Sequence, residues 1–142
     1  MVRIDRPGKP VTRLDVWSGE FDAAGKSYTV LRGIEAWWEK EHEKAGYTPD
    51  PSSDIRTLHD SFIFPAKNQI DWLDVYHPKP SEHGCVDSLR FHLPNGDEYF
   101  ASGGFGGDKH PQIPRGKQCV LEGFDLDVDG KEIRRLEPIF KK

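Results

Sequence analysis

An antiparallel all-β fold is predicted for this chain of 142 residues by two observations. Short segments with alternating apolar and polar residues follow one another along the sequence, which is typical of strands that bury one face. Fourteen glycines and eleven prolines are spread over the whole length, and Asn95-Gly96 and Asp129-Gly130 are typical hairpin turns. Strands joined by such turns run antiparallel.

One early segment, Ile34–Gly46 (IEAWWEKEHEKAG), combines helical propensity with a strand-like start. Its apolar residues end at Trp38, so a helix would bury barely one turn. As a strand, the same residues separate into two faces up to Glu39. We therefore expect a strand that ends near Glu39, followed by a polar loop over 40–53.

The later strands are predicted by the same alternation. In Gln69–Tyr76, the apolar residues change phase after Trp72, which predicts a bulge. In Val86–Leu93, His92 is expected on the face opposite Phe91. Three segments of strand, turn and strand give a faint threefold self-similarity. The predicted strands after residue 60 are Ser61–Pro65, Gln69–Tyr76, Val86–Leu93, Glu98–Phe100, Val120–Val128 and Lys131–Phe140.

Charge and composition exclude several classes of protein. The 20 basic and 24 acidic residues give a net charge of −4, so the basic stripe of a nucleic-acid-binding protein is not expected. No apolar run approaches the roughly 20 residues that span a bilayer. The charged start MVRIDRPGKP is unlike a signal peptide, which favours a cytoplasmic location over secretion without a signal. Cys85 and Cys119 are expected as reduced thiols, and one bridge between neighbouring strands is left open.

Motifs for catalysis or metal binding are weak. The histidines show no HxH or HExxH spacing and no serine lies in GxSxG, so neither an enzyme nor a cofactor is expected. Asp125, Asp127 and Asp129 resemble the opening of a calcium loop, but Leu136 occupies the twelfth position, where a bidentate carboxylate is needed. The alternative is a strand with aspartates on its wet face, followed by a hairpin turn.

A glycine-rich segment, Gly103–Gly107, surrounds a single aromatic residue. Glycines let a backbone approach a neighbour closely or adopt positive φ. One interpretation is a loop that binds a neutral polar ligand with backbone amides and a ring, and the other is a tight connection between strands. The sequence favours neither.

Four motifs in this order resemble the jacalin-type lectins. Phe21–Ile34 is similar to the family's opening strands, and SFIFP with QIDWLDVY is similar to its central strand pair. The run VDSLRFHLPNGDEYFASGGFGG and the ending from Gly116 to Phe140 are similar to its later motifs. The resemblance extends from about Leu14 to Phe140. It implies a β-prism of three antiparallel Greek-key sheets with pseudo-threefold symmetry, formed by residues 14–142 after an N-terminal extension, 1–13.

The resemblance also implies metal-independent carbohydrate binding by loops at one end of the prism. The family's GxxxD loop, whose Asp accepts hydrogen bonds from sugar hydroxyls, aligns with Gly130–Arg134, so Arg134 replaces the carboxylate. A guanidinium only donates hydrogen bonds, but it can pair with an acidic sugar. Weak single contacts would favour self-association into a homo-oligomer. The candidate carbohydrate-binding residues are Gly130, Lys131, Glu132, Ile133, Arg134, Gly103, Gly104, Phe105, Gly106, Gly107 and Trp17.

A second hypothesis is a β-prism that has lost sugar binding. Such a domain would serve as a protein-interaction or structural module, with Trp37 or Trp72 exposed on a sheet face. The middle unit of the repeat retains an Asp in Gly84–Asp87, but Asp87 stands one residue closer to the glycine than the motif requires. It is either a remnant of the motif or a strand residue only.

Overall fold

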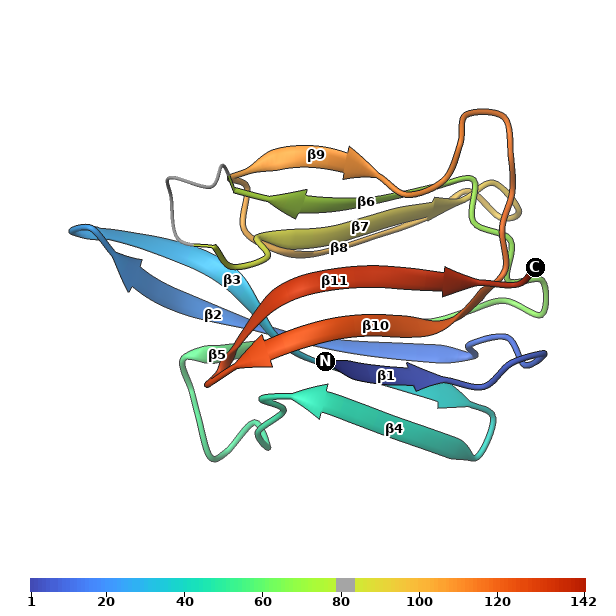
Figure 1. Cartoon of the computed structure of the whole chain (residues 1–142). Coiled ribbons are helices and arrows are strands. Elements are labelled where there is room, and N and C mark those ends of the chain that lie inside the picture. Colours follow the sequence, from blue (N-terminus) through green and yellow to red (C-terminus); the bar gives the residue numbers. More distant parts are fainter. Residues whose placement is uncertain (79–83) are drawn as a thin grey trace.

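The computed structural model describes residues 1–78 and 84–142, in which all regular secondary structure is β (Figure 1). The strands form three antiparallel sheets with the orders β4-β3-β2-β5 (first sheet), β8-β7-β6-β9 (second sheet) and β1-β10-β11 (third sheet). No helix in these residues could cross a membrane. The strands are β1 Val2–Asp5, β2 Arg13–Ala23, β3 Lys26–Trp38, β4 Glu41–Gly46, β5 Thr57–Ile63, β6 Trp72–His77, β7 Ser88–Leu93, β8 Glu98–Gly103, β9 Asp108–Pro111, β10 Leu121–Asp129 and β11 Glu132–Phe140.

The three sheets are related by pseudo-threefold symmetry. In each, a central strand (β2, β6 or β10) pairs on one side with the strand that follows it in sequence and on the other side with a more distant strand. That distant strand is β5, β9 or β1. The third sheet thus takes its outer strand from the N-terminus, so the segment expected as an extension, 1–13, contains a strand of the prism, with Ile4 and Val11 fully buried.

The core lies between the three sheets. The apolar residues of the central strands alternate inward, as the sequence pattern predicts, and Leu14, Leu73 and Leu126 are all fully buried. Phe62 and Phe91 add edge-to-face ring contact, with centroids 5.1 Å apart. Each sheet therefore also has an outer face with polar and aromatic side chains. Side chains on these outer faces can contact a ligand.

Two predicted elements are wrong in detail. Residues 41–46 were expected in a loop, but they form β4, an edge strand that pairs with β3 and buries only Ala45. The polar residues around Ala45 hide this strand from an alternation pattern. The bulge expected in Gln69–Tyr76 is also absent, because Ile70 precedes β6 and pairs separately with Cys119, and β6 pairs with β7 without a register shift.

Other expectations are resolved by the strand positions. His92 lies opposite Phe91 on the outer face, as predicted, and hydrogen-bonds to Asp71 and Asp97. Cys85 and Cys119 are both free thiols. The aspartates that resemble a calcium loop, Asp125, Asp127 and Asp129, lie within β10 and not in a loop. Among residues 1–78 and 84–142, no three His, Cys, Asp or Glu side chains are grouped to hold a metal ion.

Candidate functional site

The two glycine-containing segments predicted to bind carbohydrate lie at the same end of the prism, on the left in Figure 1. We call this region the loop end; it consists of Gly103–Gly107, between β8 and β9, and Gly130–Arg134, at the β10–β11 turn. The segment before β7 connects them, since Val86 N–H donates to Ile133 O at 2.8 Å and Gly104 N–H donates to Asp87 O at 2.8 Å. Two segments about 27 residues apart in the sequence are thus linked by backbone hydrogen bonds to the same short segment, Val86–Asp87.

The β10–β11 connection is a tight two-residue turn. Asp129 pairs with Glu132, which leaves Gly130 and Lys131 as the turn, and Gly130 has a φ of +64° that favours glycine. The Lys131 ammonium lies 4.8 Å from the centre of the Tyr47 ring. This turn carries its functional groups on side chains, because a two-residue turn leaves little backbone to surround a ligand.

Arg134 follows the turn and supplies the main charged group of the loop end. Its side chain is 33% exposed and lies 3.8 Å from the Asp129 carboxylate. The guanidinium carbon is 5.4 Å from the centre of the Phe21 ring, within the range of a cation–π contact. The neighbouring Ile133 is fully buried in the core and takes no part in the surface. A partly exposed cation above a ring is suited to an anionic or hydrogen-bond-accepting ligand.

The glycines of 103–107 are required by close packing. A Cβ at Gly103 would lie 2.2 Å from the Asp87 carbonyl oxygen, and one at Gly107 would lie 2.3 Å from the Asp87 carboxylate. Asp87 is 1% exposed beneath this segment, so it is not accessible to a ligand from solvent. Phe105, in contrast, is 94% exposed. The tight-connection interpretation explains the glycines, and the ring of Phe105 remains available for contact.

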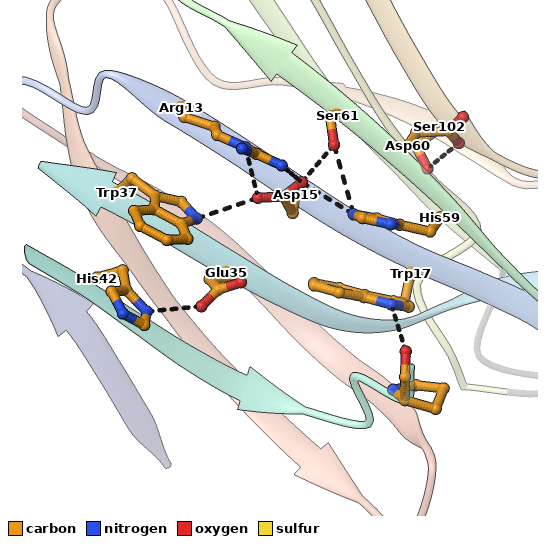
Figure 2. Close-up of polar contacts among 11 residues, drawn as sticks. Arg13, Asp15, Trp17, Glu35, Trp37, His42, His59, Asp60, Ser61 and Ser102 are labelled. Atoms are coloured by element: carbon orange, nitrogen blue, oxygen red, sulfur yellow. Dashed lines mark hydrogen bonds and ion pairs between the residues drawn. The ribbon is translucent and has the colours of Figure 1, made fainter. Parts of the chain in front are cut away.

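Trp17 is not part of the loop end. It lies on the outer face of the first sheet, where its ring stacks on His59 with centroids 4.4 Å apart, and its indole N–H donates to Pro49 O (Figure 2). Only 7% of Trp17 is exposed. A bulge in β2 at Trp17/Ser18 separates it from the residues that follow. The structure therefore brings ten of the predicted residues to one end of the prism and leaves Trp17 covered on a sheet face.

The same outer face holds a buried carboxylate, Asp15, whose partners Figure 2 shows. Arg13 donates two hydrogen bonds, at 3.0 and 3.1 Å, and Trp37 Nε1 donates one at 3.1 Å. Ser61 Oγ and His59 Nε2 complete the set. Burial raises the pKa of Asp15, but the hydrogen bonds from Ser61, Arg13 and His59 outweigh it, so the net pKa lies below the ordinary value.

Ser61, His59 and Asp15 do not form a catalytic relay. Asp15 and Ser61 both approach the same imidazole nitrogen, Nε2, at 2.8 and 3.4 Å. A relay needs one nitrogen for the serine proton and the other for the carboxylate. The Asp15 cluster is therefore an internally satisfied network.

The two tryptophans of the interaction hypothesis do not form one patch. Trp37 belongs to the outer face of the first sheet, where it stacks on His42 with centroids 4.1 Å apart. Trp72 belongs to the second sheet, beside His92 and Tyr99. Each is only partly exposed. An interface that used both would have to cover two different sheets.

Comparison with solved structures decides the fold. The structure of artocarpin, a jacalin-related lectin, in complex with methyl-α-mannose superposes with a TM-score of 0.60 over 99% of this chain and 89% of that chain, at 12% identity. The fold is the β-prism of jacalin-related lectins. No protein-family model matches the sequence, and the search of curated proteins finds no match either.

The β-prism symmetry exposes a sequence signal that the predicted site did not use. The tripeptide Leu-Asp-Val occurs at 14–16, 73–75 and 126–128, once in the central strand of each sheet. In each case leucine is buried and the aspartate points to the outer face. Asp15, Asp74 and Asp127 are therefore pseudo-symmetric positions, and their different surroundings can be compared directly.

Proposed function

We propose that this chain is a metal-independent carbohydrate-binding protein that binds a saccharide at the loop end of the prism. The observation that carries the proposal is the position of Arg134, a partly exposed cation above the Phe21 ring, at the end of the prism where Gly103–Gly107 and the β10–β11 turn meet. Artocarpin, of the same fold, is a structure with a bound mannoside, which supports a saccharide as the ligand class.

The charges of the loop end favour an acidic saccharide. Arg134 and Lys131 only donate hydrogen bonds, so they match the carboxylate of a sialylated sugar or a sulfate ester. Asp87, the carboxylate beneath Gly103–Gly107, is buried and cannot accept from a hydroxyl of an incoming sugar. The exposed carboxylate at the turn, Asp129, lies 3.8 Å from Arg134 and partly neutralises it. Exposed Phe105 offers a ring for the apolar face of a pyranose.

An array of neutral, sialylated and sulfated glycans, probed with the native protein and two variants, tests the proposal. We expect acidic glycans to bind the native protein, Arg134→Ala to lose them, and Arg134→Asp to shift any remaining signal to neutral glycans. Arg56→Ala is a matched control, because Arg56 is an exposed arginine on the β4–β5 loop, outside the candidate set. Silence of the native protein towards acidic glycans, or equal binding by Arg134→Ala, would contradict the loop-end site.

A protein-interaction role is the second candidate, and one surface favours it. Leu58, Tyr99 and Phe105 are 60%, 55% and 94% exposed and line a shallow groove of about 160 Å³ between β5 and β8. Exposed apolar residues gathered at one place are typical of interaction sites. Sedimentation velocity should then show self-association that depends on concentration and is lost in Phe105→Ser, without any response to sugars.

A further inference from the structure

Within the described part of the chain, Asp74 is the Leu-Asp-Val aspartate whose carboxylate receives no hydrogen bond. It lies in the middle of β6 with 9% of its surface exposed, and no donor among residues 1–78 and 84–142 hydrogen-bonds to its carboxylate. Asp15 has four donor residues, and Asp127 pairs with Arg135 at 3.0 Å. Its carboxylate lines an open groove, so its acceptor positions are available to a ligand that donates hydrogen bonds.

The strand register explains why the donors are missing. Ser61 faces Asp15 across β2 and β5, whereas the equivalent residue facing Asp74 is Pro111, which has no donor in its side chain or its backbone. Arg13, two residues before Asp15, corresponds to Trp72. On the other side of Asp74 lies Arg90, but its guanidinium donates to Gly104 O at 3.2 Å and lies 4.5 Å from the Tyr76 ring centre.

Asp74 lines a groove of about 820 Å³ on the outer face of the second sheet, which we call the Asp74 groove. Trp72 and Tyr76 precede and follow Asp74 by two residues on the same face, so an aromatic ring stands on each side of the carboxylate. Lys109 and the segment 113–118, which contains Arg115 and Lys117, form the rim. In Figure 1 this segment belongs to the orange stretch that leaves β9 and arches beyond the end of the sheet.

We propose that the Asp74 groove is a second saccharide-binding site, selective for uncharged sugars and independent of the loop end. The carboxylate of Asp74 accepts hydrogen bonds from ring hydroxyls, as an acceptor-only group must. Trp72 and Tyr76 contact the apolar faces of the sugar rings. Lys109, Arg115 and Lys117 donate to hydroxyl and ring oxygens from the rim.

The mixture of groups in the groove selects hydroxyls over charges. An ammonium ligand only donates, so it would satisfy Asp74, but the groove has three basic side chains, Lys109, Arg115 and Lys117, that repel it. The second carboxylate of the lining, Asp71, is already hydrogen-bonded to His92. An anion only accepts, so it would suit the rim but would meet Asp74 at the floor. A hydroxyl donates and accepts, and it therefore satisfies both sets of groups. A concave site in which aromatic rings and polar groups converge is a usual form of a small-molecule site.

The test uses the full chain and a printed panel of neutral oligosaccharides, with the strongest binder titrated by calorimetry. We expect Asp74→Asn to weaken that binding by at least about tenfold, which is a large effect for one group. Its thermal unfolding midpoint should be equal to or above that of the native protein, which shows that the loss is not due to unfolding. Asp127→Asn changes the pseudo-symmetric aspartate of the third sheet and should bind as the native protein does.

Each outcome decides between the sites. Loss in Asp74→Asn with unchanged binding in Arg134→Ala supports the groove, whatever happens to acidic glycans at the loop end. Loss in Arg134→Ala with no change in Asp74→Asn assigns neutral sugars to the loop end and overturns the groove. The groove proposal is also overturned if the native protein binds no neutral oligosaccharide, or if it binds the polyamine spermidine and no neutral sugar.

Discussion

Asp15 and Asp74 occupy the same place on two sheets of one molecule, yet their surroundings are opposite. Both follow a buried leucine, precede a buried valine and lie in a central strand. On the first sheet, Asp15 accepts hydrogen bonds from the side chains around it. On the second sheet, Asp74 faces a groove, and no donor of the described residues is hydrogen-bonded to its carboxylate. Identical local sequence thus produces a structural network on one face and a candidate binding group on another.

The difference comes from cross-strand neighbours. At the positions of Ser61 and His59 on β5, which face Asp15 and Trp17, the second sheet has Pro111 and Lys109 on β9. Because side chains opposite one another in an antiparallel pair interact directly, these two differences remove the donors that Asp15 receives from β5. The donor of Arg13 is lost as well, because Trp72 occupies the equivalent position on β6.

Removal of Asp15 should have the largest effect on stability. In Asp15→Ala, Arg13, Trp37, His59 and Ser61 lose a shared acceptor in a buried place, so we expect the free energy of unfolding to fall by about 3 kcal/mol. Urea unfolding followed by tryptophan fluorescence measures it. Asp127→Ala is the matched control, and because its ion pair with Arg135 is exposed to solvent and screened, the loss should be much smaller. Equal losses in the two variants would show that the Asp15 network adds no stability beyond an ordinary surface pair.

Much of the fold is predictable from these residues because it depends on local alternation. Leu14 and Leu126 are each flanked by polar residues, and Leu73 is followed by one, and this alternation predicts strands with one buried face. The strand β4 escapes the pattern because only Ala45 reaches the core, and the role of β1 escapes it because its partner β10 lies more than a hundred residues away.

The candidate sites depend on which residues face each other across neighbouring strands, and this pairing register cannot be read from the sequence. Trp17 is one of the candidate carbohydrate-binding residues of the sequence, but strand pairing places it beneath His59 on a sheet face. The repeated tripeptide Leu-Asp-Val can be found in the sequence alone. That Asp74 lacks donors is visible only when Pro111, which is 37 positions later, is known to face it.

Asp74→Asn should change stability in the opposite direction from Asp15→Ala. Burial raises the pKa of Asp74, and the nearby positive charges of Lys109 and Arg90 offset only part of this. The ionised form is therefore disfavoured in the folded state, and this cost grows as the pH rises through the folded pKa. At neutral pH we expect Asp74→Asn to raise the free energy of unfolding by about 1 kcal/mol.

The pH dependence checks this assignment. Below the ordinary aspartate pKa of about 3.9, Asp74 is protonated in both states, so the gain in Asp74→Asn should vanish. Asp15 behaves in the opposite way: its folded pKa is lowered, so its contribution is present above the ordinary pKa and is lost as the pH falls through the folded pKa. Urea unfolding at neutral and acidic pH separates the two. A destabilised Asp74→Asn at neutral pH would mean that its carboxylate already has a partner.

Pro111→Ser should make the second sheet resemble the first. A serine at 111 would face Asp74 as Ser61 faces Asp15 and could donate a hydrogen bond to the carboxylate. We expect the pKa of Asp74 to fall, stability at neutral pH to rise by about 0.5 to 1 kcal/mol, and neutral-sugar binding in the groove to weaken. Carbon-13 NMR titration of the Asp74 carboxyl follows the pKa. Pro111→Ala, which adds a backbone N–H without a hydroxyl, is the control, and an equal shift there would attribute the effect to the backbone.

His92 provides the smallest effect and concerns the other carboxylate of the groove, Asp71. Hydrogen bonds to Asp97 and Asp71, at 2.7 and 2.8 Å, raise the pKa of His92 above its ordinary value. Its contribution is therefore complete below the ordinary histidine pKa of about 6.5 and is lost as the pH rises through the folded pKa. Because Asp97 is almost fully exposed, His92→Gln should cost only about 0.5 kcal/mol at mildly acidic pH.

Proton NMR titration of the His92 ring measures this pKa, and Asp97→Asn should lower it. The comparison extends to binding, since Asp71 lines the same groove as Asp74 but is occupied by an imidazolium. Once His92 loses its proton, the negative charge of Asp71 is no longer balanced by an imidazolium. Asp71 still lies near the rim and is more exposed than Asp74. Neutral-sugar affinity should therefore change little across the His92 titration, and a large change would move the acceptor role from Asp74 to Asp71.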